Sequence, residues 1–330
     1  MKDLKGKKIL FIGSGFYYYD KAIIKELENF GATIRYVIEF TESYSLKLKK
    51  KISSSYYDQS VSKRENELLN LFNKETFDFI FVIRAQYLSP RFFEKLSGSQ
   101  KNAKFILYLW DSVSTTRDFD KKEKYFDKIL SFDREDSLKY QRISFRPLFY
   151  LKEYYNEHCL NRSDSKRDLY FLGRLYGDRI SVLRKIWKEC ITKGLKSKMV
   201  LYAPLNGDTI RSFLRYFIRK NDFRIISFKQ LPLVENIREM QSSISILDVE
   251  LVYQSGLTIR TIETIGSNRK LITTNKDIIH YDFYDPGRIL IIDRARPVIP
   301  AGFISEPMKP YEKEILDKYS ITGWAKEIFA

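Results

Sequence analysis

The sequence contains few of the residues that build disulfide or metal sites. Its 330 residues include two cysteines and two histidines. Cys159 and Cys190 have no metal-binding or redox spacing, which gives no disulfide framework and suits a reducing cytoplasm. His158 and His280 lie too far apart in the sequence for a typical zinc motif. The sequence therefore predicts no bound metal.

Long apolar runs are also missing. None approaches the roughly 20 residues that a membrane-spanning helix needs. The N-terminal stretch MKDLKGKKILFIGSG begins with basic residues, but its apolar run is too short for a signal peptide and is predicted as a first strand. A composition of 44% hydrophobic and 30% charged residues is typical of a soluble globular protein. We expect a cytoplasmic protein.

Positive charge and aromatic residues are abundant. The formal net charge is +16, and the chain has 23 Tyr and 24 Phe. Such a composition suits nucleic acid, an anionic membrane surface or a phosphate-bearing substrate. An AT-rich genome would produce the same excess of Lys, Ile, Phe, Tyr and Asn. Since the basic residues are scattered and no nucleic-acid motif occurs, we expect no nucleic-acid partner.

Short apolar segments alternate with helix-like segments through most of the chain. In the first half the strand-like segments are KKILFIG, TIRYVIEF, FDFIFVI, KFILYLW and YFDKILSFD. A helical segment, KAIIKELENFG, follows the first of them. Strand alternating with helix predicts a parallel sheet covered on both faces.

The same pattern restarts after a polar interval, residues 156–168, which is predicted as a linker. The second series of strand-like segments is LYFLG, KMVLYAP, FRIISF, SISILDV, KLITTN and RILIID. Helices are predicted near residues 179–193, 209–220, 233–241 and 257–267. We predict two Rossmann-like α/β domains, residues 1–160 and 161–330. A terminal helix, SITGWAKEIFA, could pack back on the first domain.

The first strand runs into the glycine-rich stretch GSGFYYYD. A glycine-rich turn between the first strand and the first helix holds the pyrophosphate in dinucleotide folds. Gly13 and Gly15 fit that pattern, but Tyr18 stands at the third glycine position, and the acid expected about 20 residues later would be Glu39. The tyrosine argues against a nicotinamide cofactor and favours a tight turn at the mouth of a cleft. Asp20 follows this turn.

A second candidate phosphate site is the stretch QSGLTIRTIETIG, residues 254–266. It follows a predicted buried strand, and the first backbone N–H groups of a helix can hold a phosphate. Gly256 would permit close approach, the hydroxyl of Thr258 could donate, and Arg260 adds a positive charge. Glu263, about one turn further on, could reach the hydroxyls of a nucleotide sugar. Equally, Arg260 and Glu263 could be simple residues of the helix surface.

Two α/β halves, with GLTIRTIETIG and KLITTN in the second, resemble bacterial glycosyltransferases of the GT-B fold that build lipopolysaccharide, capsule or exopolysaccharide. The resemblance is strongest over residues 168–293 and includes YFLGRLYGDR. It implies two domains facing a central cleft, with the nucleotide-sugar donor on the C-terminal domain and the acceptor on the N-terminal one. It further implies transfer of a sugar, with a UDP-sugar favoured, to a glycan or lipid-linked acceptor, without metal or other cofactor.

The resemblance also implies positions for the two substrates. In particular, the segment 256–258 would meet the diphosphate and Glu263 the ribose. The implied donor-binding residues are Gly173, Arg174, Arg179, Gln254, Gly256, Leu257, Thr258, Arg260 and Glu263. The implied acceptor-side residues are Gly13, Gly15 and Asp20.

The catalytic groups are less defined. Many retaining members of the fold carry a glutamate eight residues before the ribose glutamate, where this chain has Ser255, and the nearest acid upstream is Glu250. Retention and inversion therefore both remain open. Asp111 ends a predicted buried strand, where α/β folds place their sites, and is our acid–base candidate, although it could equally cap the next segment. The pair Asp118 and Asp120 lies in a run of charges and is rejected as a metal site.

The stretch RSFLRYFIRKN predicts a basic amphipathic helix, with Arg211, Arg215 and Arg219 four residues apart on one face. Such a helix suits the surface of an anionic membrane, although a surface helix packing its apolar face on the sheet would show the same pattern. Two other functions are considered, an epimerase or dehydrogenase with a Rossmann fold and a basic nucleic-acid-binding protein.

Overall fold

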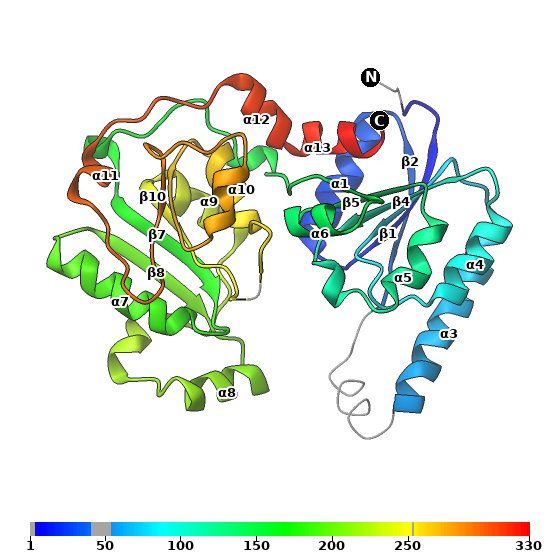
Figure 1. Ribbon diagram of the computed structural model, residues 1–330, viewed down its shortest axis with the longest axis horizontal. Helices are drawn as coiled ribbons and strands as arrows, with labels where there is room; N and C mark the ends of the chain where they lie inside the picture. Colours follow the sequence, from blue (N-terminus) through cyan, green and yellow to red (C-terminus); the bar gives the residue numbers. More distant parts are fainter. Residues whose placement is uncertain (1–3, 41–53, 253) are drawn as a thin grey trace. The chain divides into compact units, whose positions relative to one another are not determined.

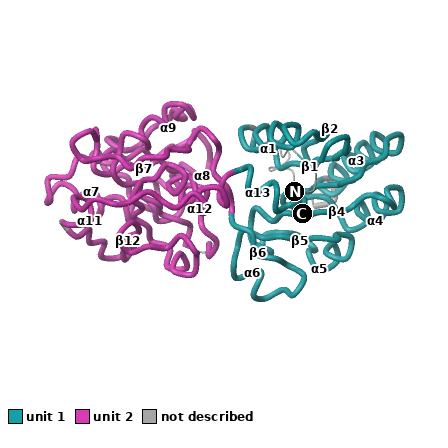
Figure 2. The backbone as a smooth tube through the Cα atoms, turned by 90° about the horizontal axis from the view of Figure 1, so that it is seen from above, with its two compact units in different colours: residues 1–147, 321–330 teal, residues 148–320 magenta. Residues whose placement is uncertain are grey.

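The computed structural model describes residues 4–40, 54–252 and 254–330 (Figure 1). The chain forms two compact units, residues 1–147 with 321–330, and residues 148–320 (Figure 2). Each unit is an α/β fold with one parallel sheet of six strands, which confirms the predicted fold class. The predicted domain boundary lies at residue 160, whereas the chain enters the second unit at residue 148. It does so because the segment after residue 147 is anchored there, with the hydroxyl of Tyr150 donating to Leu316 O at 2.8 Å.

The sheet of the first unit has the strand order β2-β1-β3-β4-β5-β6. Its strands are β1 Lys8–Gly13, β2 Thr33–Ile38, β3 Phe79–Ile83, β4 Lys104–Leu109, β5 Lys128–Ser131 and β6 Ile143–Phe145. Five of them match the apolar runs of the sequence, because a parallel strand covered on both faces reads as a continuous apolar segment. The sixth, β6, has one buried residue among its three, and its sequence carries no such signal.

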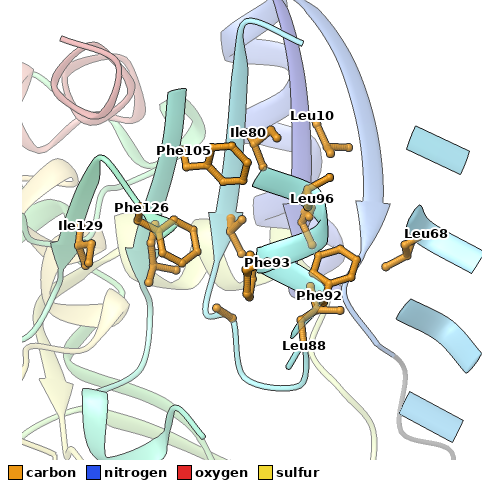
Figure 3. Close-up of a cluster of buried hydrophobic side chains, with 14 of the residues drawn as sticks. Leu10, Leu68, Ile80, Leu88, Phe92, Phe93, Leu96, Phe105, Phe126 and Ile129 are labelled. Carbon is orange, nitrogen blue, oxygen red and sulfur yellow. The ribbon is translucent and has the colours of Figure 1, made fainter. Parts of the chain in front are cut away.

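Helices cover both faces of this sheet (Figure 1). They are α1 Tyr17–Asn29, α3 Ser54–Phe72, α4 Pro90–Ser99, α5 Phe119–Lys122, α6 Arg134–Lys139 and α13 Ile321–Ile328. The start of α4 follows local rules, since Ser89 accepts from the N–H of Phe92 and Pro90 takes the first turn. Its residues Phe92, Phe93 and Leu96 pack into the apolar core shown in Figure 3. The C-terminal helix α13 belongs to this unit and buries Trp324 completely.

The sheet of the second unit has the order β12-β11-β10-β7-β8-β9. Its strands are β7 Arg167–Arg174, β8 Ser197–Tyr202, β9 Ile226–Ser227, β10 Ser243–Asp248, β11 Lys270–Thr273 and β12 Ile289–Ile291. Its helices are α7 Arg179–Thr192, α8 Gly207–Arg215, α9 Leu233–Gln241, α10 Ile259–Gly266, α11 Ala301–Ser305 and α12 Lys313–Tyr319. Each of the six strands overlaps one run of the predicted second series, although β9 takes only two residues of FRIISF.

The helix predicted for residues 209–220 is shorter in the structure, because α8 ends at Arg215. Phe217 has a φ of 46°, a left-handed conformation that an α-helix cannot continue. Beyond it, the carboxylate of Asp222 accepts from the backbone N–H of Arg219 at 2.6 Å and begins a short 3₁₀ turn. Arg219 is therefore not on the same helix as Arg211 and Arg215, and the prediction of three arginines on one helical face is wrong. Within the described residues, every helix is too short or too polar to cross a membrane.

Candidate functional site

The sheet of the second unit changes direction between β7 and β10. The chain runs outward from β7 to β8 and β9, then returns to the other side of β7 and continues from β10 to β12. The loops after β7 and β10 consequently leave the sheet in opposite directions. This switch point at the carboxyl ends of the two strands, called the crevice below, is where open α/β sheets bind their ligands. The sequence candidates after residues 173 and 248 both lie at this edge.

The helix that starts at this edge is α10, and its first turn is held from the end of β10. Thr258 is its N-cap, with its hydroxyl accepting from the N–H of Thr261 at 3.4 Å. The same hydroxyl donates to the carboxylate of Asp248 at 2.8 Å, and the hydroxyl of Thr261 donates to it at 2.9 Å. Because its proton is given to Asp248 and its oxygen accepts from Thr261, Thr258 fixes the helix start, and an anion bound here would be held by backbone N–H groups at the N-terminus of the helix.

The loop before α10 is also internally bonded. The side-chain amide of Gln254 donates to Gly256 O at 2.9 Å, and Asn275 donates to Ser255 O at 3.0 Å. Gly256 and Leu257 are both buried. These contacts fix the backbone conformation of the loop before the helix. In this structure the side chain of Gln254 therefore supports the loop.

An arginine that the sequence does not mark ties three strand ends together. Arg294 follows β12, and its guanidinium binds the carboxylate of Asp178 with two nitrogens, at 2.7 and 3.3 Å. It also lies 2.6 Å from Glu250 and donates to Thr274 Oγ1 at 3.1 Å. Burial raises the pKa of Glu250, although Thr274 and Arg294 favour its charged form. Asp178 precedes α7, so this arginine clamp, residues 178, 250, 274 and 294, fixes the loops around the crevice.

The three candidates at and after the end of β7, Gly173, Arg174 and Arg179, have different surroundings. Arg174 is exposed at the strand end. Arg179 is turned to the protein, and its Nε donates to Val249 O at 2.8 Å, which joins the loop after β7 to the loop after β10. A side chain at Gly173 would meet the ring of Phe171, so packing demands this glycine. Of the three, Arg174 is the one whose charge faces solvent at the crevice.

Glu263 is buried and forms an ion pair with the partly exposed Arg260, so the expectation that Glu263 could be a helix-surface residue is wrong. The side chains of Arg260 and Glu263 are 16% and 2% exposed, with Arg260 Nη1 2.9 Å from Glu263 Oε2. A chain of hydrogen bonds continues from Tyr170 to Asn236 and on to Tyr154. Burial, and after it the charge of Glu263, raises the pKa of Tyr154. For Glu263 to contact a ribose, this buried network would have to open.

The glycine-rich turn of the first unit is closed by its own aspartate. Asp20 is buried, and its carboxylate accepts from the N–H of Gly15 at 2.8 Å and the hydroxyl of Tyr36 at 2.7 Å. Gly15 has a φ of 82°, and a side chain at Gly13 would meet Tyr36 and Asp20. Both glycines are therefore required by the turn. Glu39 is buried as well and accepts from the N–H groups of Tyr87 and Leu88, so it is not presented to a dinucleotide ribose.

The sheet of the first unit changes direction between β1 and β3, and a charged and aromatic cluster stands at that edge. Arg84 and Ala85, just after β3, both have left-handed backbone, with φ of 78° and 51°; such strain is concentrated at functional sites. Arg84 Nε lies 2.7 Å from the carboxylate of Asp111, and its guanidinium lies over the ring of Phe16. The side chain of Asp111 is 44% exposed and is thus accessible to a substrate.

The other charged candidates show no metal geometry. Asp118 precedes α5 and pairs with Arg117 and Lys121 at 3.4 and 3.3 Å, as expected for a solvated segment. His280 lies 3.8 Å from Asp277 and is half exposed. Among the described residues there is no group of three His, Cys, Asp or Glu side chains arranged to hold an ion.

The sequence could have pointed to more of this site. Asp248 ends a fully buried strand, Thr274 directly follows the next strand, and Arg294 lies three residues after the end of the one after it. Polar residues at successive strand ends meet at one edge of a parallel sheet. By contrast, nothing in the sequence marks the left-handed backbone of Arg84.

Several solved structures are similar to this protein over nearly the whole chain. An α,α-trehalose-phosphate synthase (UDP-forming) from Burkholderia xenovorans has a TM-score of 0.62 and 10% identity, covering 98% of this chain and 99% of that one. A glycosyltransferase from Rickettsia africae has a TM-score of 0.57 and 13% identity, covering 98% and 97%. A UDP-GlcNAc 2-epimerase from Methanocaldococcus jannaschii, solved with UDP-GlcNAc and UDP, has a TM-score of 0.55 and 11% identity, covering 98% of both chains. The fold is therefore that of GT-B glycosyltransferases. No family model matches the sequence, and no curated protein matches it.

Proposed function

We propose that this protein is a glycosyltransferase that uses a nucleoside-diphosphate sugar, with UDP as the nucleotide. The observation that carries the proposal is the start of α10 at the crevice between β7 and β10, where the N-cap Thr258 and Asp248 fix the first turn of the helix. The fold is shared with enzymes whose names include UDP or a UDP-sugar. The sequence identity to these enzymes is 11% and 10%. The UDP donor is therefore proposed from the residues of the site as well as from the shared fold.

In this proposal the diphosphate binds the first turn of α10, with the exposed Arg174 as a positively charged partner. Helix N-termini and arginines stabilise the negative charge that develops on a leaving diphosphate. The arginine clamp and Arg179 do not touch the donor but hold the two loops that do. The transfer then needs no metal ion.

On the first unit, we propose that the acceptor binds at the edge that carries Asp111, Arg84 and Phe16. The carboxylate of Asp111 is accessible and is held by Arg84, which suits a general base that removes the proton of an acceptor hydroxyl. The turn formed by Gly13, Gly15 and Asp20 shapes the same edge. The proposed acceptor is a glycan or lipid-linked glycan in the assembly of a bacterial surface polysaccharide.

A thermal-shift panel of UDP, GDP, CMP and nicotinamide nucleotides tests the donor. A ligand that binds only the folded protein stabilises it by mass action and so raises its Tm. At a ligand concentration of one hundred times the Kd, the free energy of unfolding rises by about 2.7 kcal/mol. We expect UDP or a UDP-sugar to give the largest shift. If no nucleoside diphosphate raises the Tm, the proposal is wrong.

A second candidate is an epimerase acting on a UDP-sugar, since an enzyme of that activity has the same fold over the whole chain. The two functions differ in what they need besides the donor. An epimerase converts UDP-N-acetylglucosamine alone into its C2 epimer, whereas a transferase releases UDP only when an acceptor or water receives the sugar. Nuclear magnetic resonance of the donor incubated alone separates the two, and an accumulating epimer would favour the second candidate.

A further inference from the structure

A cavity of about 360 Å³ lies in the first unit. It is bounded by α3, the loop after β3, the first turns of α4, and α5 with the residues just before it. Helices α3 and α4 lie side by side, and so do α4 and α5 (Figure 1). The volume falls in the range of about 300–1,000 Å³ that is usual for small-molecule sites. The loop after β3 places the cavity at the carboxyl edge of the sheet, where α/β folds bind ligands.

The cavity has an apolar floor and a polar rim. The apolar lining residues are at most 8% exposed and are Val61, Leu69, Leu88 and Phe92. Leu88 and Phe92 belong to the core shown in Figure 3. The uncharged polar lining residues are Ser62, Asn66, Tyr87 and Ser89. Hydroxyl and amide groups around an apolar floor suit a small ligand that carries several hydroxyl groups.

The carboxylates at this cavity are already bound to groups of the protein. Glu65 is buried and accepts from the backbone N–H of Ser89 at 2.5 Å. Asp58 and Asp118 each lie 3.4 Å from Arg117. Since each carboxylate has a donor or a cation beside it, the cavity does not require a positively charged ligand.

Two cations of α4 remain at the wall of the cavity. Arg91 and Lys95 both line it and are exposed. They are four residues apart, so their side chains leave the same side of the helix. Within residues 4–40, 54–252 and 254–330, no ion pair joins either of them to a carboxylate. An arginine can bind one anion with two N–H groups and a lysine adds a compact charge, so together they suit a phosphate or a carboxylate.

A third cation at the wall, Lys122, is only 1% exposed. Its Nζ donates to Ala85 O at 2.8 Å, and an ammonium group has three N–H donors. Burial lowers the pKa of Lys122 to about 8, against the opposing effect of the Glu39 carboxylate. Below that pH the ammonium group is mostly charged and attracts an anion. Buried ionisable groups with shifted pKa values at a cavity are typical of functional sites.

From this arrangement we propose that the cavity binds a small acidic sugar, whose phosphate or carboxylate lies between Arg91 and Lys95. The hydroxyl groups of the sugar face Ser62, Asn66 and Ser89, and its ring packs on the apolar floor. The two cations of α4 select an anion over a neutral ligand, and the paired carboxylates give no site for a cation. The proposal does not rest on the proposed glycosyl transfer, because this binding needs no nucleotide.

Isothermal titration of the full-length protein tests the proposal with galactose 6-phosphate, galacturonate and galactose, which differ at one carbon. We expect both acidic sugars to bind, and the tighter of the two identifies the preferred acidic group. Galactose should bind at least about tenfold more weakly, because it lacks the charge-assisted hydrogen bonds to α4. Inorganic phosphate should bind more weakly than galactose 6-phosphate, since it cannot contact the floor and the rim together.

The variant Arg91→Ala/Lys95→Ala should bind the acidic sugars more than about tenfold more weakly. Asn66→Trp places a large ring in the cavity and should have the same effect while both cations remain. As a matched control, Lys101→Ala/Lys104→Ala removes two exposed cations of the same unit that do not line the cavity, and it should bind as the wild type does. All of these side chains are exposed, so the Tm should not change.

Three results would overturn the proposal. These are wild-type protein that binds neither acidic sugar, wild-type protein that binds galactose as tightly as the acidic sugars, or a control variant that loses as much affinity as Arg91→Ala/Lys95→Ala. The outcome is separate from that of the nucleotide panel. Binding of an acidic sugar without any response to UDP would support this cavity and contradict the glycosyltransferase, and the reverse result would do the opposite.

Discussion

At the scale of single residues, the second unit depends on charged side chains that are buried with specific partners. Arg294 contacts groups from three loops, and Glu263 is enclosed with Arg260. Removing one member of such a pair leaves its partner without compensation in a site of low polarity, and this costs more than the pair itself contributes. Substitutions at these positions therefore report on structure first and on ligand binding second.

Arg294→Ala should lower the free energy of unfolding by about 3 kcal/mol, because Glu250 and Asp178 lose their counter-charge. It should also weaken UDP binding, since both loops at the crevice are released. The double variant Glu250→Gln/Arg294→Ala should be less destabilised than the two single variants added together. Denaturant unfolding of the four proteins measures this coupling, and strict additivity would show that the clamp is not a unit.

Glu263→Ala should lower the free energy of unfolding by about 3 kcal/mol, because the largely enclosed guanidinium of Arg260 loses its carboxylate partner. Glu263→Gln keeps the shape and should cost less. Calorimetry with UDP on the folded Gln variant then separates the two roles of this residue. Unchanged affinity assigns Glu263 to the buried network, whereas a loss of tenfold or more with a wild-type Tm would assign it to the ribose.

At the scale of the element, the short helix α10 matters for its first turn. The eight residues Ile259–Gly266 form too short a helix to be stable alone, and Asp248 with Thr258 supplies the missing support. The end of α8 is fixed in a comparable way, by Asp222 and Arg184. Both elements take their boundaries from polar contacts with other parts of the unit.

Thr258→Ala should remove the cap of α10 and cost about 1 kcal/mol. Because the backbone donors of the first turn become mobile, UDP affinity should fall by about tenfold, while Thr258→Ser should preserve both properties. Isothermal titration with UDP provides the measurement. If the alanine variant binds UDP as tightly as the wild type, the nucleotide does not contact this turn.

Acid should weaken the end of α8. Burial alone would raise the pKa of Asp222, but Arg184 and the N–H of Arg219 hold it below its usual value. A carboxyl with a lowered folded-state pKa stabilises the protein above its unfolded pKa of about 3.9, and this contribution disappears as the pH falls through the folded value. The Tm of Asp222→Asn should therefore be a few degrees below wild type at about pH 7, and this gap should close towards about pH 3. A gap that is constant with pH would contradict the assignment.

At the scale of the whole molecule, each of the two parallel sheets has one edge where charged side chains gather at the strand ends. The second unit offers a helix N-terminus and arginines, and the first offers an exposed carboxylate held by Arg84. Positive groups of the protein can take over the neutralising role that a metal ion has in other enzymes.

Glycosyl transfer should accordingly persist in excess EDTA. Arg174→Ala should slow it by at least about tenfold, because a positive partner of the diphosphate is lost. Asp118→Ala and Asp120→Ala serve as matched controls and should leave the rate unchanged. Loss of turnover with the chelator and recovery with manganese would show that a metal takes part.

The sequence by itself determined the strands and their number in the second unit, because burial on both faces of a parallel sheet requires continuous apolar runs. It also indicated the start of α10, since a cap and a preceding glycine are local signals. The ends of α8 could not be found in this way. Phe217 adopts its left-handed conformation while Asp222 is held by Arg184, which lies 38 positions away.

Only the tertiary structure decided which charged residues meet. Arg294 and Asp178 are 116 positions apart, and the hydrophobic pattern treats each as an ordinary polar residue at the end of a strand or the start of a helix. Likewise, Glu263 has the spacing of a surface residue, but it is buried beside Tyr154 and Arg260, and Asn236 in turn contacts Arg260. Periodicity records which side of an element is apolar, whereas ion pairs depend on how distant strands are ordered in the sheet, and that order follows from packing of the whole unit.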